Sequence, residues 1–315
     1  GDSAAGIRRS SVGDNHLADQ SSIQSLYQRQ KGRRQALGRI KRQDDNGNRC
    51  RHAASGFAVK TAYIASIDKG IAMAQPEQPH SILQVTGADR IGFLQNLVTN
   101  DVSTPGLHYT ALLTPQGKYL ADFFVLHQPN DLLIDVASEI CPSILARLSM
   151  YRLRADVQIS EVDINLCCGL GTIPPDGFAD PRNPILGWRA YGRQEAGSID
   201  WPALRVAHII PETGIELTPD RFILEMDFER LSGVDFKKGC YVGQEIVARM
   251  KHKTELRKGL RQVKISGSAP IGTAIIANEK PAGVLYTQHS GLALAYLRFD
   301  RIAPEMVAGS AIITL

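Results

Sequence analysis

Hydrophobic residues in the first half of the chain follow two patterns, a helical repeat and short apolar runs. Together these patterns predict a unit of strands and helices. Apolar residues at Ile91, Leu94 and Val98 share one face of an expected helix over 88–100, and a second helix is expected over 144–151. Short apolar runs, typical of strands, occupy five stretches: 81–85, 109–113, 119–126, 132–136 and 157–162. This order of strands and helices is that of a ferredoxin-like half.

Turn and capping residues separate these predicted elements. The sequence Thr-Pro-Gln-Gly at 114–117 puts Pro at the second and Gly at the fourth position of a type I turn, which predicts a hairpin. A second α+β unit is expected from about residue 164, with a proline-rich front. Within it, Asp200 and Pro202 predict the start of a helix that reaches His208.

From residue 257 the pattern changes to short apolar runs separated by Gly and Pro. Four of these runs predict strands: 260–265, 274–277, 283–286 and 292–297. Regular short strands with turn residues between them favour a small β-barrel. We therefore expect an α+β protein with four parts: a disordered basic extension over 1–72, a first α+β unit over 73–163, a second over 164–256 and a C-terminal β-barrel over 257–315.

Charge is unevenly distributed along the 315 residues. The net charge is +4, but residues 1–72 carry thirteen Lys or Arg and six Asp, a net +7, which leaves −3 for residues 73–315. The basic segment has little apolar periodicity, so we expect it to be disordered in isolation. Its origin as a native tail, a targeting peptide or an upstream extension stays open. No apolar run approaches the length of a bilayer-spanning helix, so no membrane segment is expected.

The cysteines are spaced unlike a disulfide framework or a metal site. They lie at positions 50, 141, 167, 168 and 240, without a Cys-x-x-Cys pair, so neither disulfides nor a four-cysteine zinc or iron–sulphur site is expected. The eight His show no metal-ligand spacing, so we predict no permanent metal. Cys167 and Cys168 lie in an apolar stretch and are expected to be buried packing. This usage fits a reducing cytoplasm, or the mitochondrial matrix if the chain is eukaryotic.

Residues 238–245, Lys-Gly-Cys-Tyr-Val-Gly-Gln-Glu, place one thiol between two glycines. Two glycines four apart suit a tight loop, because glycine has the greatest backbone freedom. Lys237 and Lys238 would favour the thiolate of Cys240 if they lie beside it. The next residues are expected to open a helix in which Glu245 and Arg249 pair one turn apart. A glycine turn with an ordinary packed cysteine explains the same spacing.

The order of these eight residues resembles the signature of the YgfZ family. That family comprises folate-binding proteins of iron–sulphur cluster assembly and repair, which are distant relatives of the glycine-cleavage T-protein. Other segments follow the family's order: 85–90, 113–118, 151–155 and 180–182. The resemblance runs from about residue 81 to the C-terminus. It implies a T-protein-like body made of two ferredoxin-like α+β units, followed by the barrel.

The resemblance also implies a ligand and a working group. It implies tetrahydrofolate, or a derivative, in a cavity among the domains, and a functional thiol at Cys240 with Lys238, Gln244 and Glu245 around it. For the folate it points to six residues: Tyr119, Asp122, Arg154, Trp188, Arg189 and Arg249. The T-protein branch carries paired acids in the hairpin strand, whereas this chain has Ala121-Asp122. The missing acid weakens the case for aminomethyl transfer, which needs a positioned carboxylate.

Positive charge gathers between residues 237 and 264, where nine Lys or Arg face two Glu. A solvated surface accounts for such a run, and so does an anion site that would attract the glutamate tail of a folate. Nucleic acid is an unlikely partner, because Tyr241 is the one aromatic residue in the run and a stacking platform needs several.

These observations favour a tetrahydrofolate-binding accessory protein for assembly or repair of iron–sulphur clusters in client proteins. A tetrahydrofolate-dependent aminomethyltransferase is the alternative, and a basic nucleic-acid-binding module is a third hypothesis. The sequence leaves open whether the chain is an enzyme, which clients it serves and its oligomeric state. It also leaves open whether Cys240 is a redox centre, a transient cluster ligand, or an acceptor of sulphur or a one-carbon unit.

Overall fold

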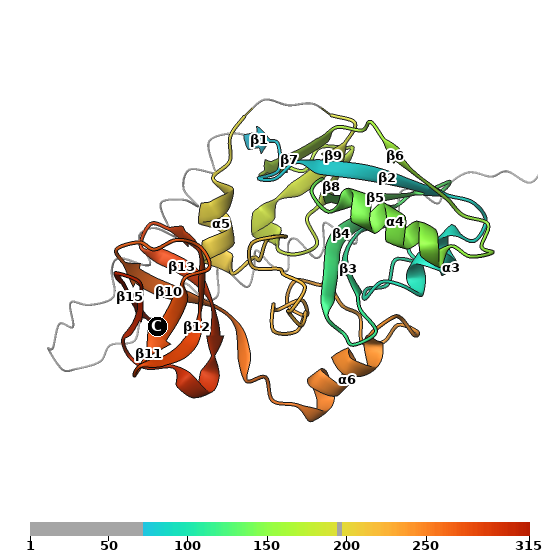
Figure 1. Cartoon of the computed structure of the whole chain (residues 1–315). Coiled ribbons are helices and arrows are strands. Elements are labelled where there is room, and N and C mark those ends of the chain that lie inside the picture. The colour runs from blue at the N-terminus through green and yellow to red at the C-terminus, as the bar shows by residue number, and fades with distance from the viewer. Residues whose placement is uncertain (1–71, 194–196) are drawn as a thin grey trace, which may run out of the picture. The chain divides into compact units, whose positions relative to one another are not determined.

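The computed structural model describes residues 72–193 and 197–315, so the expected extension over 1–72 lies almost wholly outside the described residues. Its first sheet has five antiparallel strands in the order β3-β4-β5-β2-β6 (Figure 1). The strands are β2 (His80–Thr86), β3 (Gly106–Leu113), β4 (Tyr119–His127), β5 (Leu132–Ala137) and β6 (Gln158–Val162). Four of them, β6-β2-β5-β4, have the strand order of a ferredoxin-like unit, and β3 extends this sheet at the β4 edge through the predicted hairpin.

Two helices cover one face of this sheet: α3 (Arg90–Gln95) and α4 (Cys141–Tyr151). Leu94 of α3 and Leu148 of α4 are buried in the same cluster as Val85 and Phe123 of the sheet. The sequence predicted a helix over 88–100, but α3 ends at Gln95. Beyond it the chain turns toward the sheet, where Val98 pairs with Leu112 of β3, so tertiary pairing overrides the helical pattern.

The second sheet has four antiparallel strands in the order β1-β7-β9-β8. Its strands are β1 (Ala72–Ala74), β7 (Leu166–Leu170), β8 (Gly177–Ala179) and β9 (Trp188–Tyr191), with a 3-10 turn, η1 (Pro184–Leu186), before β9. Cys167 and Cys168 of β7 are buried, as predicted for packing residues. The predicted helix is α5 (Trp201–His208), where the Asp200 side chain accepts a hydrogen bond from the Ala203 amide at 3.0 Å.

The C-terminal strands close into a barrel in the order β10-β13-β12-β11-β14-β15, which confirms the predicted architecture. They are β10 (Lys258–Ser266), β11 (Ala274–Ala277), β12 (Lys280–His289), β13 (Leu292–Arg298), β14 (Met306–Ala308) and β15 (Ala311–Thr314), with η2 (Phe299–Arg301) after β13. The sequence pattern missed β14 and β15, which have three and four residues. α6 (Gln244–Lys253) precedes the barrel.

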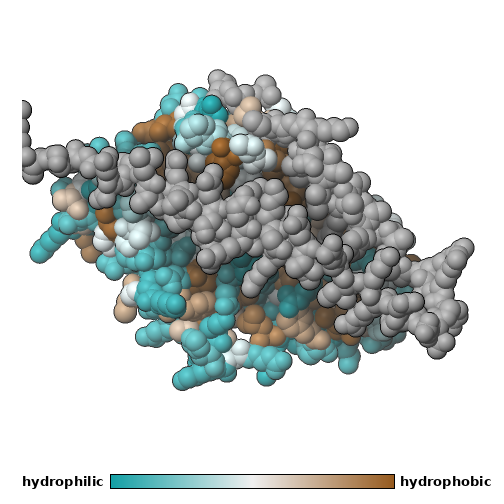
Figure 2. Space-filling model, turned by 180° about the vertical axis from the view of Figure 1, so that it is seen from behind, coloured by the Kyte–Doolittle hydropathy of each residue, from teal (hydrophilic) through white to brown (hydrophobic). Residues whose placement is uncertain are grey.

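One buried cluster connects the body to the barrel. It contains Phe124 of β4, Leu204 of α5, and Leu260 and Leu294 of the barrel. The described part of the face in Figure 2 is mainly hydrophilic, with hydrophobic atoms in smaller patches. Among the described residues, the helices are all too short or too polar to cross a membrane.

Candidate functional site

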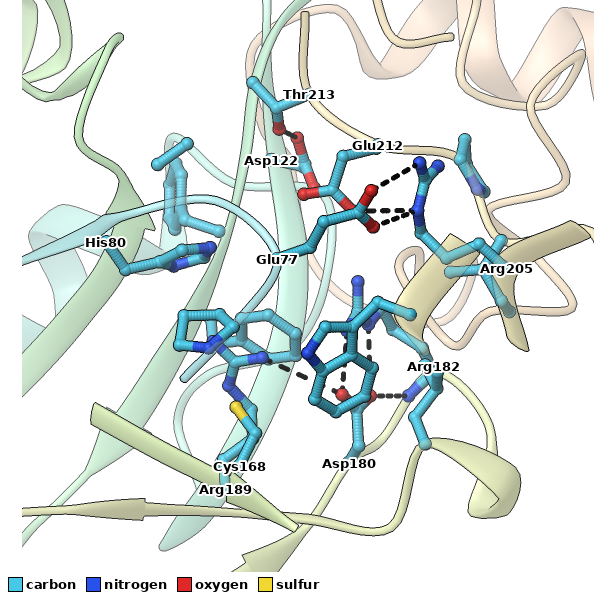
Figure 3. Close-up of a pocket in the computed structure, with 18 residues that line it drawn as sticks. Glu77, His80, Asp122, Cys168, Asp180, Arg182, Arg189, Arg205, Glu212 and Thr213 are labelled. Atoms are coloured by element: carbon cyan, nitrogen blue, oxygen red, sulfur yellow. Dashed lines mark hydrogen bonds and ion pairs between the residues drawn. The ribbon is translucent and has the colours of Figure 1, made fainter. Parts of the chain in front are cut away.

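A pocket lies between the two sheets and is lined by the segment that joins β1 to β2 and by the loop that follows α5 (Figure 3). It contains about 650 Å³ of space not occupied by protein atoms, part of it open to solvent. Apolar groups from Phe124, Leu186, Trp201 and Ile210 form part of its wall. Its charged and titratable residues are Glu77, His80, Asp122, Cys168, Asp180, Arg182, Arg189, Arg205 and Glu212.

Asp122 of β4 is a pocket acid that is held by hydroxyl groups of the protein. Its carboxylate accepts hydrogen bonds from the hydroxyls of Tyr109 at 2.8 Å, Tyr119 at 2.6 Å and Thr213 at 2.5 Å. Burial, together with the charge of Asp122, raises the pKa of both tyrosines well above the usual value, so they remain neutral donors. These three donors fix the carboxylate in one orientation at the pocket wall.

Glu212 supplies a second carboxylate to the pocket, from the loop after α5 (Figure 3). Burial raises its pKa, and the charges of Arg205 and Arg182 act in the opposite direction. Its Oε2 atom lies 3.7 Å from Nε of Arg205. A partly compensated, half-buried acid in a pocket is the kind of group that binds or protonates a ligand.

Arg205 of α5 connects three parts of the structure at the pocket rim. Its guanidinium contacts Glu77 at 2.6 Å, Glu216 at 3.1 Å and the hydroxyl of Thr287 in β12 at 3.2 Å. Glu216 in turn accepts hydrogen bonds from the amide and hydroxyl of Thr287. This network holds the segment before β2, the loop after α5 and the barrel in one arrangement.

Two arginines lie at the opposite wall, beside the ring of Phe124. Arg182 donates twice to Asp180, and Arg189 donates twice to Asp135, which also contacts Nδ1 of His80 at 2.5 Å. Although burial favours the neutral acid, Arg189 and His80 hold the pKa of Asp135 well below its usual range. Both guanidinium groups lie within 5 Å of the Phe124 ring centre.

Every arginine that lines the pocket is therefore paired with at least one carboxylate, while Asp122 and Glu212 present oxygen atoms to it. Such a lining suits a flat, largely apolar ligand with N–H donors on its edge. It offers little to a strongly anionic group. None of the nine Lys or Arg between residues 237 and 264 is among the residues that line the pocket.

The loop of residues 238–243 lies away from this pocket, against the β3–β4 turn. Gly243 has φ +85°, and a Cβ there would lie 2.7 Å from the carbonyl oxygen of Thr114. A Cβ on Gly117 would lie 2.8 Å from Cβ of Ile246 in α6. Both glycines are thus required for the close contact between this loop, the start of α6 and the turn.

Lys238 anchors the loop to the end of α3. Its buried ammonium donates hydrogen bonds to the carbonyl oxygens of Gln95 at 2.8 Å, Val98 at 2.7 Å and Asn100 at 2.8 Å. Burial lowers its pKa to about 8, with Asp101 and Asp235 acting in the opposite direction. All three N–H bonds of the ammonium have partners, so this lysine fixes the loop and the turn after α3 together.

Cys240 is exposed at the tip of this anchored loop and is not among the residues that line the pocket. Gln244 is half-buried and its side-chain amide lies 3.4 Å from the carbonyl oxygen of Gly239. Glu245 and Arg249 are both exposed, and the ion pair expected between them is not formed in the described structure. The thiol is therefore presented to solvent on a fixed backbone.

The structure brings together some of the residues predicted to bind folate and separates others. Tyr119, Asp122 and Arg189 meet at the pocket. Trp188 lies buried within the second sheet, against Gly169, and not in the pocket. Arg154, after α4, and Arg249, on α6, are exposed and lie outside the pocket.

Sequence reasoning missed Glu77, Arg205, Glu212 and Thr213 as pocket residues. They come from the segment before β2, from α5 and from the loop after it, and short-range patterns do not connect these segments. One available signal was the presence of a large charged residue, Arg205, between Leu204 and Val206, which are buried in the helix. A buried arginine needs carboxylate partners, and Glu212 and Glu216 follow within eleven residues.

Comparison with known proteins agrees with this architecture. Residues 257–315 match the family model of the CAF17 C-terminal beta-barrel domain. The crystal structure of the glycine cleavage system aminomethyltransferase T from Bartonella henselae has a TM-score of 0.62 to this chain at 14% identity. The superposition covers 77% of this chain and 84% of that one, so the two share a fold.

Curated relatives carry a consistent name. A protein of Mycosarcoma maydis, named iron-sulfur cluster assembly factor IBA57 homolog, mitochondrial, is 29% identical over 218 residues, which is 57% of this chain and 54% of that protein. The mouse protein named iron-sulfur cluster assembly factor IBA57, mitochondrial, is 25% identical over 273 residues, 70% of this chain and 76% of its own length. The chain thus spans about half of the fungal relative and three quarters of the mouse one. It combines the fold of aminomethyltransferase T with sequence similarity to mitochondrial iron–sulphur cluster assembly factors.

Proposed function

We propose that this protein is an accessory factor in iron–sulphur cluster assembly, which binds a reduced folate in the pocket and presents Cys240 to a partner protein. One observation carries the proposal. An exposed thiol sits on a loop fixed by Lys238, in a chain whose curated relatives are named iron–sulfur cluster assembly factors. The same relatives support a mitochondrial location as part of the proposal.

The pocket chemistry supports the folate. The pteridine of a folate is flat and has an amino-pyrimidinone edge that donates hydrogen bonds, which the carboxylates of Asp122 and Glu212 would accept. Apolar walls from Phe124, Leu186 and Ile210 would cover its faces. A bound reduced folate would supply one-carbon or reducing chemistry. The residues of the chain orient it and keep the phenols of Tyr109 and Tyr119 protonated beside Asp122.

The geometry around Cys240 limits what the thiol does alone. An iron–sulphur cluster needs about four protein ligands. Within residues 72–193 and 197–315, no group of three His, Cys, Asp or Glu side chains lies close enough together to hold a metal ion. Cys240 would therefore supply one ligand, and a partner protein would supply the others.

The test is rescue of iron–sulphur enzymes by the full chain in cells that lack their own copy. We expect the wild-type chain to restore the activity of an aconitase-type [4Fe–4S] enzyme. At equal protein level, Cys240→Ala should restore at least tenfold less activity than the wild-type chain. Cys141→Ala is the control, because that thiol is buried and distant in sequence. Equal activity with the wild-type chain and with an empty vector would contradict the proposal.

Aminomethyl transfer remains a second candidate because of Glu212. The single acid of the hairpin strand argued against this activity, but Glu212 provides another carboxylate in the same pocket. Incubating the protein with tetrahydrofolate and an aminomethylated carrier protein tests the candidate. Formation of methylene-tetrahydrofolate that depends on Asp122 would establish the transfer, and its absence with folate bound would exclude it.

A further inference from the structure

The surface at the ends of α3 and α4 has two unusual features for a monomer. Leu153 follows α4 with φ +46° and is 88% exposed, and Met150 in the last turn of α4 is 62% exposed. A bulky residue rarely adopts a left-handed backbone, and exposed leucine side chains gain nothing from folding. Leu153 combines both costs within a turn that is closed by a hydrogen bond from the Ala155 amide to the Arg152 carbonyl oxygen at 2.8 Å. That turn needs no apolar side chain at position 153.

A shallow groove lies next to these two side chains. Gly92 and Phe93 of α3, with Asp89 before the helix and Asn96 after it, form one side of it, and Tyr151 and Ala155 form the other. Phe93 and Tyr151 are half-buried, so their rings contribute apolar surface to the groove. Together with Met150 and Leu153 they form what we call the α3–α4 surface.

Unpaired cations flank this surface. Arg147, Arg152 and Arg154 form no ion pair with any acid in the described part of the chain. Two exposed acids lie nearby, Asp89 in the groove lining and Asp156; their carboxylates accept backbone amides at 2.8 Å and 3.1 Å, so both keep their charge but are outnumbered by the three arginines. The Arg152 guanidinium donates only to the carbonyl oxygen of Val157, at 3.5 Å. An apolar patch edged by guanidinium groups without a carboxylate partner is complementary to an acidic protein surface with an apolar hollow.

The helix that lines the groove also holds the loop that carries Cys240. The helix α3 lines the groove with Gly92 and Phe93 and ends at Gln95, whose carbonyl oxygen accepts a hydrogen bond from Lys238. A helix is about 10 Å wide with its side chains. A standard interface buries about 800 Å² on each partner, which is roughly 30 Å across. One partner of ordinary size therefore covers both features at once.

We infer that the α3–α4 surface is the docking site for an acidic iron–sulphur protein that meets Cys240 in the same complex. The inference rests on the proposed function, because it takes the partner of Cys240 to be the occupant. The apolar side chains of Met150 and Leu153 anchor the partner, the arginines orient it, and the fixed loop aligns the thiol with its cluster site.

A glycine substitution separates docking from folding. Glycine prefers the left-handed backbone of residue 153, so Leu153→Gly keeps or raises the melting temperature while it removes the anchor. Two controls match it on the barrel: Ser290→Gly, at an exposed residue with φ +49°, and Ile271→Ala, at an apolar side chain that is 56% exposed. Cys240→Ala is the reference for loss of the thiol.

The readouts are rescue of the [4Fe–4S] enzyme, the melting temperature and tetrahydrofolate affinity of each full-length variant. We expect Leu153→Gly to restore at least fivefold less enzyme activity than the wild-type chain, with an equal or higher melting temperature and unchanged folate affinity, while both barrel controls rescue fully. Full rescue by Leu153→Gly beside failure of Cys240→Ala would overturn the docking site and leave the proposed function intact. Failure of the wild-type chain to rescue would overturn both.

A photo-crosslinking residue gives an independent test of the same surface. Placed at position 153, it should form an adduct with an acidic iron–sulphur protein, and the yield should fall when Arg152 and Arg154 are changed to Glu. Placed at position 271 it should not form that adduct. The same adducts from both positions, or none from position 153 in cells that the chain rescues, would contradict the docking site.

Discussion

The pocket and the Cys240 loop differ in almost every physical respect. The pocket is lined by residues from both sheets, α5 and the loop after it, and its charges are paired within the protein. The loop is local in sequence, is held by one buried lysine and by the close contact of Gly243 with the β3–β4 turn, and carries an exposed thiol. Enclosure and internal pairing suit a small ligand, whereas exposure on a fixed backbone suits a macromolecular partner. We conclude that the molecule separates ligand binding from partner chemistry.

The largest expected effect concerns the anchor of the loop. Lys238→Met keeps the length of the side chain but leaves the carbonyl oxygens of Gln95, Val98 and Asn100 without their donor. At about 1 kcal/mol or more for each orphaned acceptor, the free energy of unfolding should fall by about 3 kcal/mol.

Lys237→Met is the matched control, because Lys237 is exposed, and its effect should stay within about 0.5 kcal/mol. Urea unfolding of the three proteins measures the difference. Equal stability of the two variants would show that the ammonium of Lys238 does not hold the loop, and the contrast between fixed loop and closed pocket would lose its basis.

The next effect concerns the second carboxylate of the pocket. Glu212→Gln keeps the shape of the side chain but removes the charge that would accept N–H donors of a pteridine. The charge adds about 1.5 kcal/mol to such hydrogen bonds. Its removal should therefore lower the affinity for tetrahydrofolate about tenfold. Calorimetric titration measures this, with Glu255→Gln on the exposed segment after α6 as control. Unchanged affinity would remove Glu212 from the ligand site.

The same variant should change the pH dependence of stability. Burial raises the pKa of Glu212, so the folded state holds its proton to a higher pH than the unfolded state, where a carboxyl titrates at about 4.3. The free energy of unfolding therefore falls as pH rises through this window in the wild-type protein. Glu212→Gln lacks this loss, so its stability relative to wild type should increase from pH 4 to 7. An equal pH dependence of the melting temperature in the two proteins would show that burial does not disfavour the charged form of Glu212.

The smallest expected effect concerns the tail of the folate. The sequence suggested that cations between residues 237 and 264 would attract the glutamate tail, but those cations do not line the pocket, and the pocket arginines are paired with acids. Lengthening the tail from one to five glutamates should change the affinity less than threefold at moderate salt. A gain of tenfold or more that disappears with added salt would show a cationic path from the pocket.

The contrast also explains which features could be predicted from sequence. Residues 238–245 contain the loop, its glycines and its thiol, so a local pattern was enough to find them. The strands and the barrel followed from short apolar runs, because several strands are buried along most of their length. The end of α3 could not be predicted from local sequence, because it depends on the pairing of Val98 with Leu112 in β3.

Pocket residues could not be assembled from sequence because their contacts span long distances along the chain. Glu77 contacts Arg205 across 128 positions, and Asp122 contacts Thr213 across 91. Trp188 and Arg189 are neighbours in sequence, yet alternate residues of a strand face opposite sides, so only the arginine reaches the pocket. Tertiary structure alone decides which of two adjacent candidates lines a site.

The most direct test of the separation is a calorimetric titration of tetrahydrofolate into the full-length wild-type protein and into Cys240→Ala, with Asp122→Ala alongside. The account predicts the same dissociation constant for wild type and Cys240→Ala within a factor of two, and a loss of at least tenfold in affinity for Asp122→Ala, whose carboxylate organises three hydroxyl groups at the pocket wall. Absence of binding to the wild-type protein, or a tenfold loss in Cys240→Ala, would contradict it.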